Sequence, residues 1–89
     1  MQIQFSEEVD HELKKIKQKD QLLTKRIEKQ LVLFQENPRH PSLRLHKLSG
    51  ELSELWSISI SKSIRMVYIQ DEDIAYFVDI GSHDEVYRK

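Results

Sequence analysis

The stretch that decides the fold is Ile74-Ala-Tyr-Phe-Val-Asp-Ile-Gly-Ser-His-Asp-Glu-Val-Tyr87, whose first half is a nearly continuous apolar run. Such a run predicts a strand covered on both faces, in the middle of a sheet. Gly81 lets the backbone turn, and Ser82 then predicts the cap of a short terminal helix with acidic residues in its first turn. His83 and Tyr87 would lie where the strand ends, either as reactive groups or as part of a capped surface tail.

Length and composition restrict the class of protein. The chain has 89 residues and 38% hydrophobic residues, which suits one folded domain over residues 1–89. The absence of cysteine excludes disulfides, a thiolate metal site and a cysteine nucleophile. The N-terminus lacks the pattern of a secretion signal, and no apolar run approaches the roughly 18 residues of a membrane span. We therefore expect a cytoplasmic protein that does not bind a membrane.

The charges are unevenly distributed, although the net charge is only −1. Residues 1–36 carry seven basic and seven acidic side chains, and residues 66–89 carry two against six. Residues 37–65 carry five basic side chains against two acidic ones, and they also contain His40 and His46. This middle third is the part of the sequence that favours an anionic partner.

The first half of the chain predicts a short strand and a helical hairpin. Gln2 to Phe5 alternates polar and apolar residues, and Ser6 followed by two acids is typical of a helix cap. The apolar pattern breaks at Lys17, and Asp20 predicts the cap of a second helix that runs to about Pro38. Apolar residues at helical spacing predict the buried stripe of the hairpin: Val9, Leu13, Ile16, Leu23, Ile27, Leu31 and Phe34.

The second half predicts strands. Leu43, Leu45 and Leu48 suggest an extended segment that Gly50 ends, and residues 55–61 alternate large apolar side chains with serines. Residues 63–69 form a further strand, joined to the Ile74 strand by a turn at residues 71–73. The expected fold is α+β, with an N-terminal helical hairpin packed on one face of a small, mainly antiparallel sheet and the other face open.

The open face collects the candidate chemistry. Ser57, Ser59 and Arg65 alternate with the apolar residues of their strands, so they should converge there. A buried arginine needs a partner, and the planar guanidinium of Arg65 suits a phosphate. A structural ion pair, for example with Asp79, is the alternative.

Histidines are candidates for proton transfer near neutral pH. His46 and His83 lie in segments that could approach the open face, whereas we expect His11 and His40 to be exposed. No His-x-x-x-His or His-x-x-Glu pair falls on one helix face, so a metal site is not expected. For His46 and His83, a purely structural role stays open.

Four segments carry a resemblance to a known family. They are Leu45-His-Lys-Leu-Ser-Gly50, Trp56 with its alternating neighbours, Ile64-Arg-Met-Val-Tyr68 and Ile80-Gly-Ser-His-Asp-Glu-Val-Tyr87. Together they resemble the RelE/ParE superfamily of bacterial toxins, and the resemblance covers essentially the whole chain. The last segment is the most specific, and it is similar to the RelE, YafQ and HigB branch of ribosome-dependent mRNA endonucleases.

The resemblance implies the toxin of a type II toxin–antitoxin module, which cleaves mRNA in the ribosomal A site by attack of the 2′-hydroxyl on the adjacent phosphate. It implies three partners (an antitoxin, the ribosome and mRNA) and no cofactor. By position, Arg65 would contact phosphate, His46 and His83 would transfer protons, and Tyr87 would lie near the reacting nucleotide. Further cations that we expect to bind RNA are Lys47, Arg44, Lys62 and Arg88.

The sequence departs from the pattern of the mRNA endonucleases in two ways, which leave other functions open. Ser59 and Ser63 stand where a YafQ-like site has a further histidine and an acid, so the sequence mixes two catalytic styles. Mild acidity is also unusual for a protein that binds ribosomal RNA. The alternatives are a ParE-like inhibitor of DNA gyrase and a degenerate antitoxin-binding protein with little activity.

Overall fold

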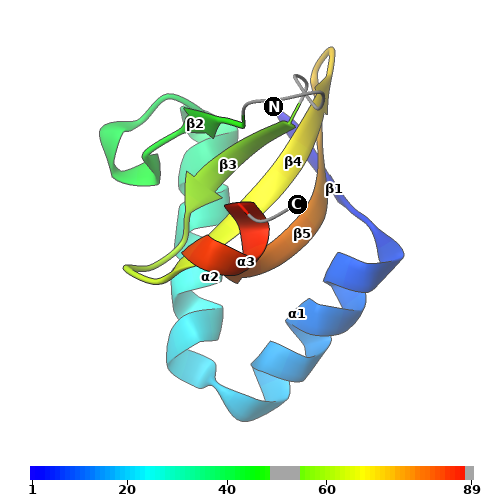
Figure 1. Cartoon of the computed structure of the whole chain (residues 1–89), viewed down its shortest axis with the longest axis vertical. Coiled ribbons are helices and arrows are strands. Elements are labelled where there is room, and N and C mark those ends of the chain that lie inside the picture. Colours follow the sequence, from blue (N-terminus) through cyan, green and yellow to red (C-terminus); the bar gives the residue numbers. More distant parts are fainter. Residues whose placement is uncertain (49–54, 88–89) are drawn as a thin grey trace.

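A computed structural model describes residues 1–48 and 55–87 of the chain. These residues form one five-stranded sheet with helices on both faces (Figure 1). In chain order the elements are β1 (Gln2–Phe5), α1 (Glu7–Lys19), α2 (Gln21–Glu36), the 3₁₀ turn η1 (Pro41–Leu43), β2 (His46–Lys47), β3 (Leu55–Ser59), β4 (Ile64–Asp71), β5 (Ile74–Ser82) and α3 (His83–Tyr87). The predicted α+β class and the single helical hairpin are confirmed.

The helical hairpin begins where its capping residues predict. The Ser6 hydroxyl accepts a hydrogen bond from the backbone N–H of Val9, and the Asp20 carboxylate accepts one from Leu23. Asp20 ends α1 and begins α2, so α1 continues past the break expected at Lys17. In the described residues no helix is long and apolar enough to cross a membrane.

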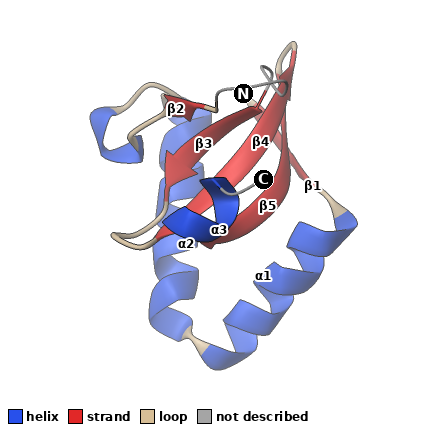
Figure 2. Cartoon of the chain, viewed as in Figure 1, coloured by secondary structure: helices blue, strands red, loops and turns tan. Residues whose placement is uncertain are grey.

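The sheet has the strand order β1-β5-β4-β3-β2. β1 pairs with β5 in parallel, and the other pairs are antiparallel, which confirms a mainly antiparallel sheet. β5 is an interior strand, as expected, but the middle position belongs to β4. Figure 2 shows α2 behind the sheet, α3 in front of it and α1 at the lower right.

A bulge in β5 decides which of its side chains enter the core. Val67 pairs with Asp79 and Tyr68 pairs with Phe77, so Val78 is an extra residue in β5. Without it, strict alternation from Phe77 would carry Asp79 to the apolar face of the sheet. The expectation that β5 is covered on both faces along its length is wrong, because Tyr76 is 38% exposed.

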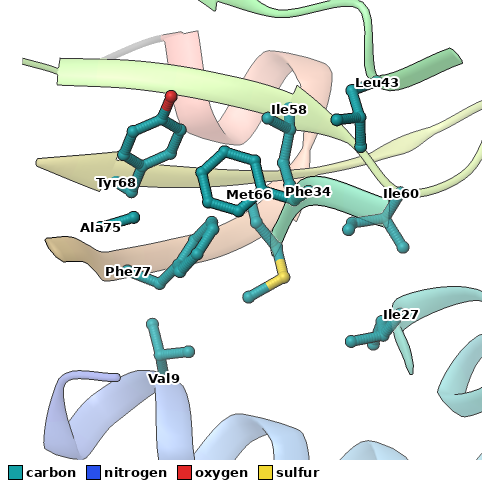
Figure 3. Packing of buried hydrophobic residues seen from close by; sticks show 10 residues of the cluster. All are labelled: Val9, Ile27, Phe34, Leu43, Ile58, Ile60, Met66, Tyr68, Ala75 and Phe77. Carbon is teal, nitrogen blue, oxygen red and sulfur yellow. The ribbon is translucent and has the colours of Figure 1, made fainter. Parts of the chain in front are cut away.

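The core lies between the hairpin and the sheet (Figure 3). Three aromatic rings form its centre: Phe34 lies 5.0 Å from Tyr68 and 5.6 Å from Phe77, measured between ring centroids. All seven predicted hairpin residues are buried in this core or packed against it, as are Trp56, Ile58 and Ile60. The prediction that these strand residues face the helices is therefore confirmed.

The opposite face of the sheet is partly covered rather than fully open. Val86 of α3 and Val67 of β4 are each only 3% exposed, and α3 packs on β4 and β5. The rest of that face carries Ser57, Ser59 and Arg65 towards the β3–β4 turn, and Ile69 and Tyr76 towards the β4–β5 turn. Ile69 and Tyr76 are 37% and 38% exposed, so both ends of this face are accessible.

Candidate functional site

An open groove of about 900 Å³ lies beside the β3–β4 turn, between α2 and the segment that precedes β2. Its walls come from parts of the chain that are far apart in sequence. The lining residues are Arg26, Lys29, Gln30, Ser42, Arg44, Ser59, Ile60, Ser61, Lys62, Arg65 and His83.

The groove is strongly cationic. Five of its lining residues are lysine or arginine, and none of the described lining residues is acidic. A cleft lined by charges of one sign concentrates the field inside it. The groove therefore attracts an anionic ligand even though the whole chain has a net charge of −1.

Arg65 lines the groove and is held by several hydrogen bonds. Its Nε donates to the Ser57 hydroxyl at 3.1 Å, and one terminal nitrogen donates to the Arg44 carbonyl at 2.7 Å and the Ser57 carbonyl at 3.3 Å. Ser57 is fully buried beneath it. The small side chain of Ser57 leaves space for the guanidinium on this face, which explains why β3 alternates with serine.

The segment before β2 is shaped differently from the sequence prediction. Instead of a continuous extended segment, residues 41–43 form η1, and Arg44 ends it with φ of 45°. The His40 ring accepts a hydrogen bond from the backbone N–H of Ser42, so His40 caps η1 and is half-buried rather than exposed. Because Arg65 holds the Arg44 carbonyl, this turn is fixed to the sheet.

Gln30 was missed by the sequence analysis. It is only 9% exposed, and its side-chain amide donates to the carbonyls of Ser59, at 2.9 Å, and Ser42, at 3.4 Å. It thus joins α2 to β3 and to η1 below the groove. Its burial could have been predicted from the sequence, because the helical spacing places Gln30 on the apolar face of α2 between Ile27 and Phe34.

His83 is positioned by the cap of α3. The Ser82 hydroxyl accepts from the Glu85 N–H at 3.2 Å, and the Glu85 carboxylate accepts from the Ser82 N–H at 2.9 Å, which confirms Ser82 as the cap. The backbone N–H of His83 also donates to the Ser63 carbonyl at 3.3 Å. A Cβ at Gly81 would lie 3.3 Å from the Glu85 side chain, so a larger residue there would require Glu85 to shift slightly.

The structure brings together some of the predicted site residues and separates others. Arg44, Lys62, Arg65 and His83 line the groove. His46 pairs with Ser57, so it lies on the Arg65 face of the sheet but outside the lining. Lys47 lies on the opposite face, 5.5 Å from the centre of the Trp56 ring.

Two predicted site residues, Tyr87 and Arg88, and two unpredicted groove residues, Arg26 and Lys29, remain to be placed. Tyr87 is the last residue of α3, and its proposed role stays a prediction. Arg88 lies outside the described residues. Arg26 and Lys29 line the groove but were not predicted, because they belong to the electrically balanced first third of the sequence.

Tyr68 in the core has a perturbed pKa. Burial raises the pKa of Tyr68 to about 12, and this residue belongs to the core rather than to the groove. Among residues 1–48 and 55–87, no three histidine or acidic side chains are grouped so that they could hold a metal ion. The described side chains of the groove offer hydrogen bonding, positive charge and proton transfer.

A helical hairpin packed on a small, mainly antiparallel sheet matches the fold of RelE-like toxins. The chain belongs to the YafQ family of bacterial toxins of type II toxin–antitoxin systems, because the model of that family matches residues 1–88. A comparison with curated protein sequences gives no significant match.

Solved structures agree with this fold. The YoeB–YefM complex from Staphylococcus aureus superposes with a TM-score of 0.78 at 23% identity, covering 93% of this chain and 97% of the other. YafQ from Escherichia coli strain BL21(DE3) gives a TM-score of 0.69 at 16% identity and 96% coverage of both chains. The E. coli DinJ–YafQ toxin–antitoxin complex gives 0.65 at 18% identity, covering 96% of this chain and 94% of the other.

Proposed function

We propose that this toxin is an endoribonuclease that cleaves mRNA on the ribosome by attack of a 2′-hydroxyl on the adjacent phosphate. The observation that carries the proposal is the groove itself, in which five cations and His83 converge without an acidic lining residue. RNA binding depends mainly on phosphate contacts, which such a lining supplies.

Arg65 is the group proposed to stabilise the transition state. Attack on phosphorus places additional negative charge on the phosphoryl oxygens, and a fixed cation stabilises that charge most effectively when it needs no reorganisation. Three hydrogen bonds already fix the Arg65 guanidinium, and their acceptors, on Ser57 and Arg44, are neutral oxygens. These contacts hold the guanidinium in one orientation.

Histidine would move the protons. The 2′-hydroxyl must lose a proton and the leaving 5′-oxygen must gain one. His83 lines the groove with its side chain 68% exposed, so a bound RNA can reach the ring. His46 is proposed as the second proton-transfer group from the family resemblance and from its place on the same sheet face.

A cognate antitoxin is the proposed partner. Membership of the family implies a module of two proteins, and the solved relatives include toxins in complex with YefM and with DinJ. We infer that the antitoxin of this chain suppresses its activity by binding to it. Ribosome and mRNA are the proposed targets of the free toxin.

Expression of the chain alone, from an inducible promoter, tests this function. Primer extension on a translated message should reveal new 5′ ends within minutes of induction, and Arg65→Ala should abolish them. Coexpression of the neighbouring antitoxin gene should restore growth. Toxicity with no mRNA cleavage, together with inhibition of purified gyrase, would instead assign the ParE-like function.

A further inference from the structure

The groove has two cationic walls that come from different parts of the fold. Lys62 and Arg65 belong to the β3–β4 turn and to β4, whereas Arg26 and Lys29 belong to α2. Residues three apart on a helix lie on the same face, so Arg26 and Lys29 form one local patch. Ile27, between them in sequence, is 5% exposed and points into the core, which directs the two cations away from it.

The α2 wall is held at a fixed position relative to the sheet. Gln30 follows Lys29 directly, and its side-chain amide donates to the carbonyls of Ser59 and Ser42. Ser59 pairs with Arg65 across β3 and β4. Therefore a short chain of contacts connects the helix that carries Arg26 and Lys29 to the strand that carries Arg65.

We propose that Arg26 and Lys29 bind a second backbone phosphate of the same RNA strand, next to the phosphate held by Arg65. The inference rests on the proposed function, because it takes the phosphate at Arg65 to be the scissile one. A groove of about 900 Å³ is at the upper end of ordinary ligand pockets, about 300–1,000 Å³, so it has room for more than one nucleotide.

The role of this second site is to position the substrate. A strand held at two phosphates has its register and direction fixed, which contacts to a single phosphate do not achieve. Loss of Arg26 and Lys29 should therefore weaken the binding of RNA that has several phosphates. It should not affect the binding of RNA that has only one.

The test uses the full chain and short, uncleavable RNA analogues. A dinucleotide carries one internucleotide phosphate and a tetranucleotide carries three; both are made with 2′-O-methyl groups so that no attack can occur. Binding is followed by NMR titration of wild type and of the double variant Arg26→Gln/Lys29→Gln. The control is Lys25→Gln, which removes one exposed cation of α2 that does not line the groove.

The double variant should bind the tetranucleotide about 10-fold or more weakly, and the slope of log K against log salt should become shallower by about 0.7 for each lost phosphate contact. Its dinucleotide affinity, and both affinities of Lys25→Gln, should match wild type. Unchanged thermal melting would show that the fold is intact.

Three results would overturn the proposal. The first is that the double variant binds the tetranucleotide as tightly as wild type does. The second is that the double variant loses the same affinity for the dinucleotide as for the tetranucleotide. The third is that wild type binds neither RNA but binds an acidic peptide through Arg26 and Lys29. A different result separates the two proposals. If the tetranucleotide binds through Arg26 and Lys29 but wild type cleaves no message, the proposed function fails and the second phosphate site stands.

Discussion

At the scale of single residues, Arg65 is the group on which the proposed chemistry depends. Its hydrogen bonds to the Ser57 hydroxyl, the Ser57 carbonyl and the Arg44 carbonyl use several edges of the planar guanidinium. A lysine has the same charge but a single ammonium group, so it cannot reproduce these contacts. Replacing Arg65 by lysine therefore separates the effect of its positive charge from the effect of its fixed orientation.

Arg65→Lys is therefore an informative variant. We expect its single-turnover rate of mRNA cleavage on ribosomes to fall about 10-fold or more, because the positive charge is kept while its fixed orientation is lost. Lys47→Gln is the control, since Lys47 lies over Trp56 on the opposite face. Full cleavage by Arg65→Lys would show that charge alone is sufficient.

We expect Tyr68 to make the free energy of unfolding depend on pH in the alkaline range. Its hydroxyl group has a pKa of about 12 in the folded protein and an ordinary value of 10.0 when unfolded, so the unfolded chain loses this proton first. The free energy of unfolding should be unaffected by this group below pH 10.0 and should fall as the pH rises towards about 12.

Urea denaturation across that range checks the pH dependence. Tyr68→Phe should remove this part of the decline, whereas Tyr76→Phe, which changes an exposed tyrosine, should retain it. Equal slopes for Tyr68→Phe and wild type would mean that Tyr68 does not retain its proton in the folded state.

At the scale of elements, sequence predicts best where the signal is local. Ser6, Asp20 and Ser82 each cap the helix that their neighbours indicate. The bulge at Val78 was not predictable from local pattern, because an apolar run reads as a continuous strand until its pairing with β4 is known. Tertiary pairing also determined that only His46 and Lys47 form β2.

Local sequence patterns do not show which distant segments meet, and this explains why part of the groove lining was not predicted. Arg65, Lys62, Arg44 and His83 were predicted from short segments around the strands, and they do line the groove. Arg26 and Lys29 were not predicted, because their contribution arises only when α2 is placed against the end of β3. Lys47 pairs with Trp56 and lies on the opposite face of the sheet, and its predicted contact with RNA stays a prediction.

The contact between α2 and the sheet can be tested at Gln30. Gln30→Met keeps the length of the side chain but removes the amide N–H donors. The carbonyls of Ser59 and Ser42 then lose the hydrogen bonds that they accept from Gln30. We expect a loss of about 1–3 kcal/mol in the free energy of unfolding, measured by urea denaturation. Gln35→Met, at an exposed position of α2, should change it by less than about 0.5 kcal/mol. Equal effects of the two substitutions would contradict the proposed link.

At the scale of the whole molecule, one face of the sheet carries the main core, and the other carries the residues of the candidate site beside the smaller α3 contact. The aromatic cluster of Phe34, Tyr68 and Phe77 lies on the helix face, and the Ser57–Arg65 pair lies on the other. The net charge of −1 conceals a basic groove, because the acidic residues that the structure describes lie outside its lining, and in residues 66–89 of the sequence acidic residues outnumber basic ones by six to two. The average charge is therefore a poor guide to the partner of this protein.

This division predicts a large stability effect in the core. Phe34→Ala should lower the free energy of unfolding by about 3–5 kcal/mol, because Phe34 is fully buried between two aromatic rings. Val32→Ala, at a position of α2 that is 53% exposed, should lower it by less than about 0.5 kcal/mol. Chemical denaturation measures both, and a small effect of Phe34→Ala would contradict the assignment of the core.

The most direct test of the central claim is single-turnover cleavage of a defined message on purified ribosomes by wild type, Arg65→Ala, His83→Ala and the double variant. Wild type should yield a 5′ fragment ending in a 2′,3′-cyclic phosphate, the product of 2′-hydroxyl attack. Each single variant should lose about 10²-fold or more in rate, and the double variant should lose far less than the product of the two losses, as expected of groups that act in one step. Cleavage at the wild-type rate by both single variants would contradict the claim that the groove is the catalytic site.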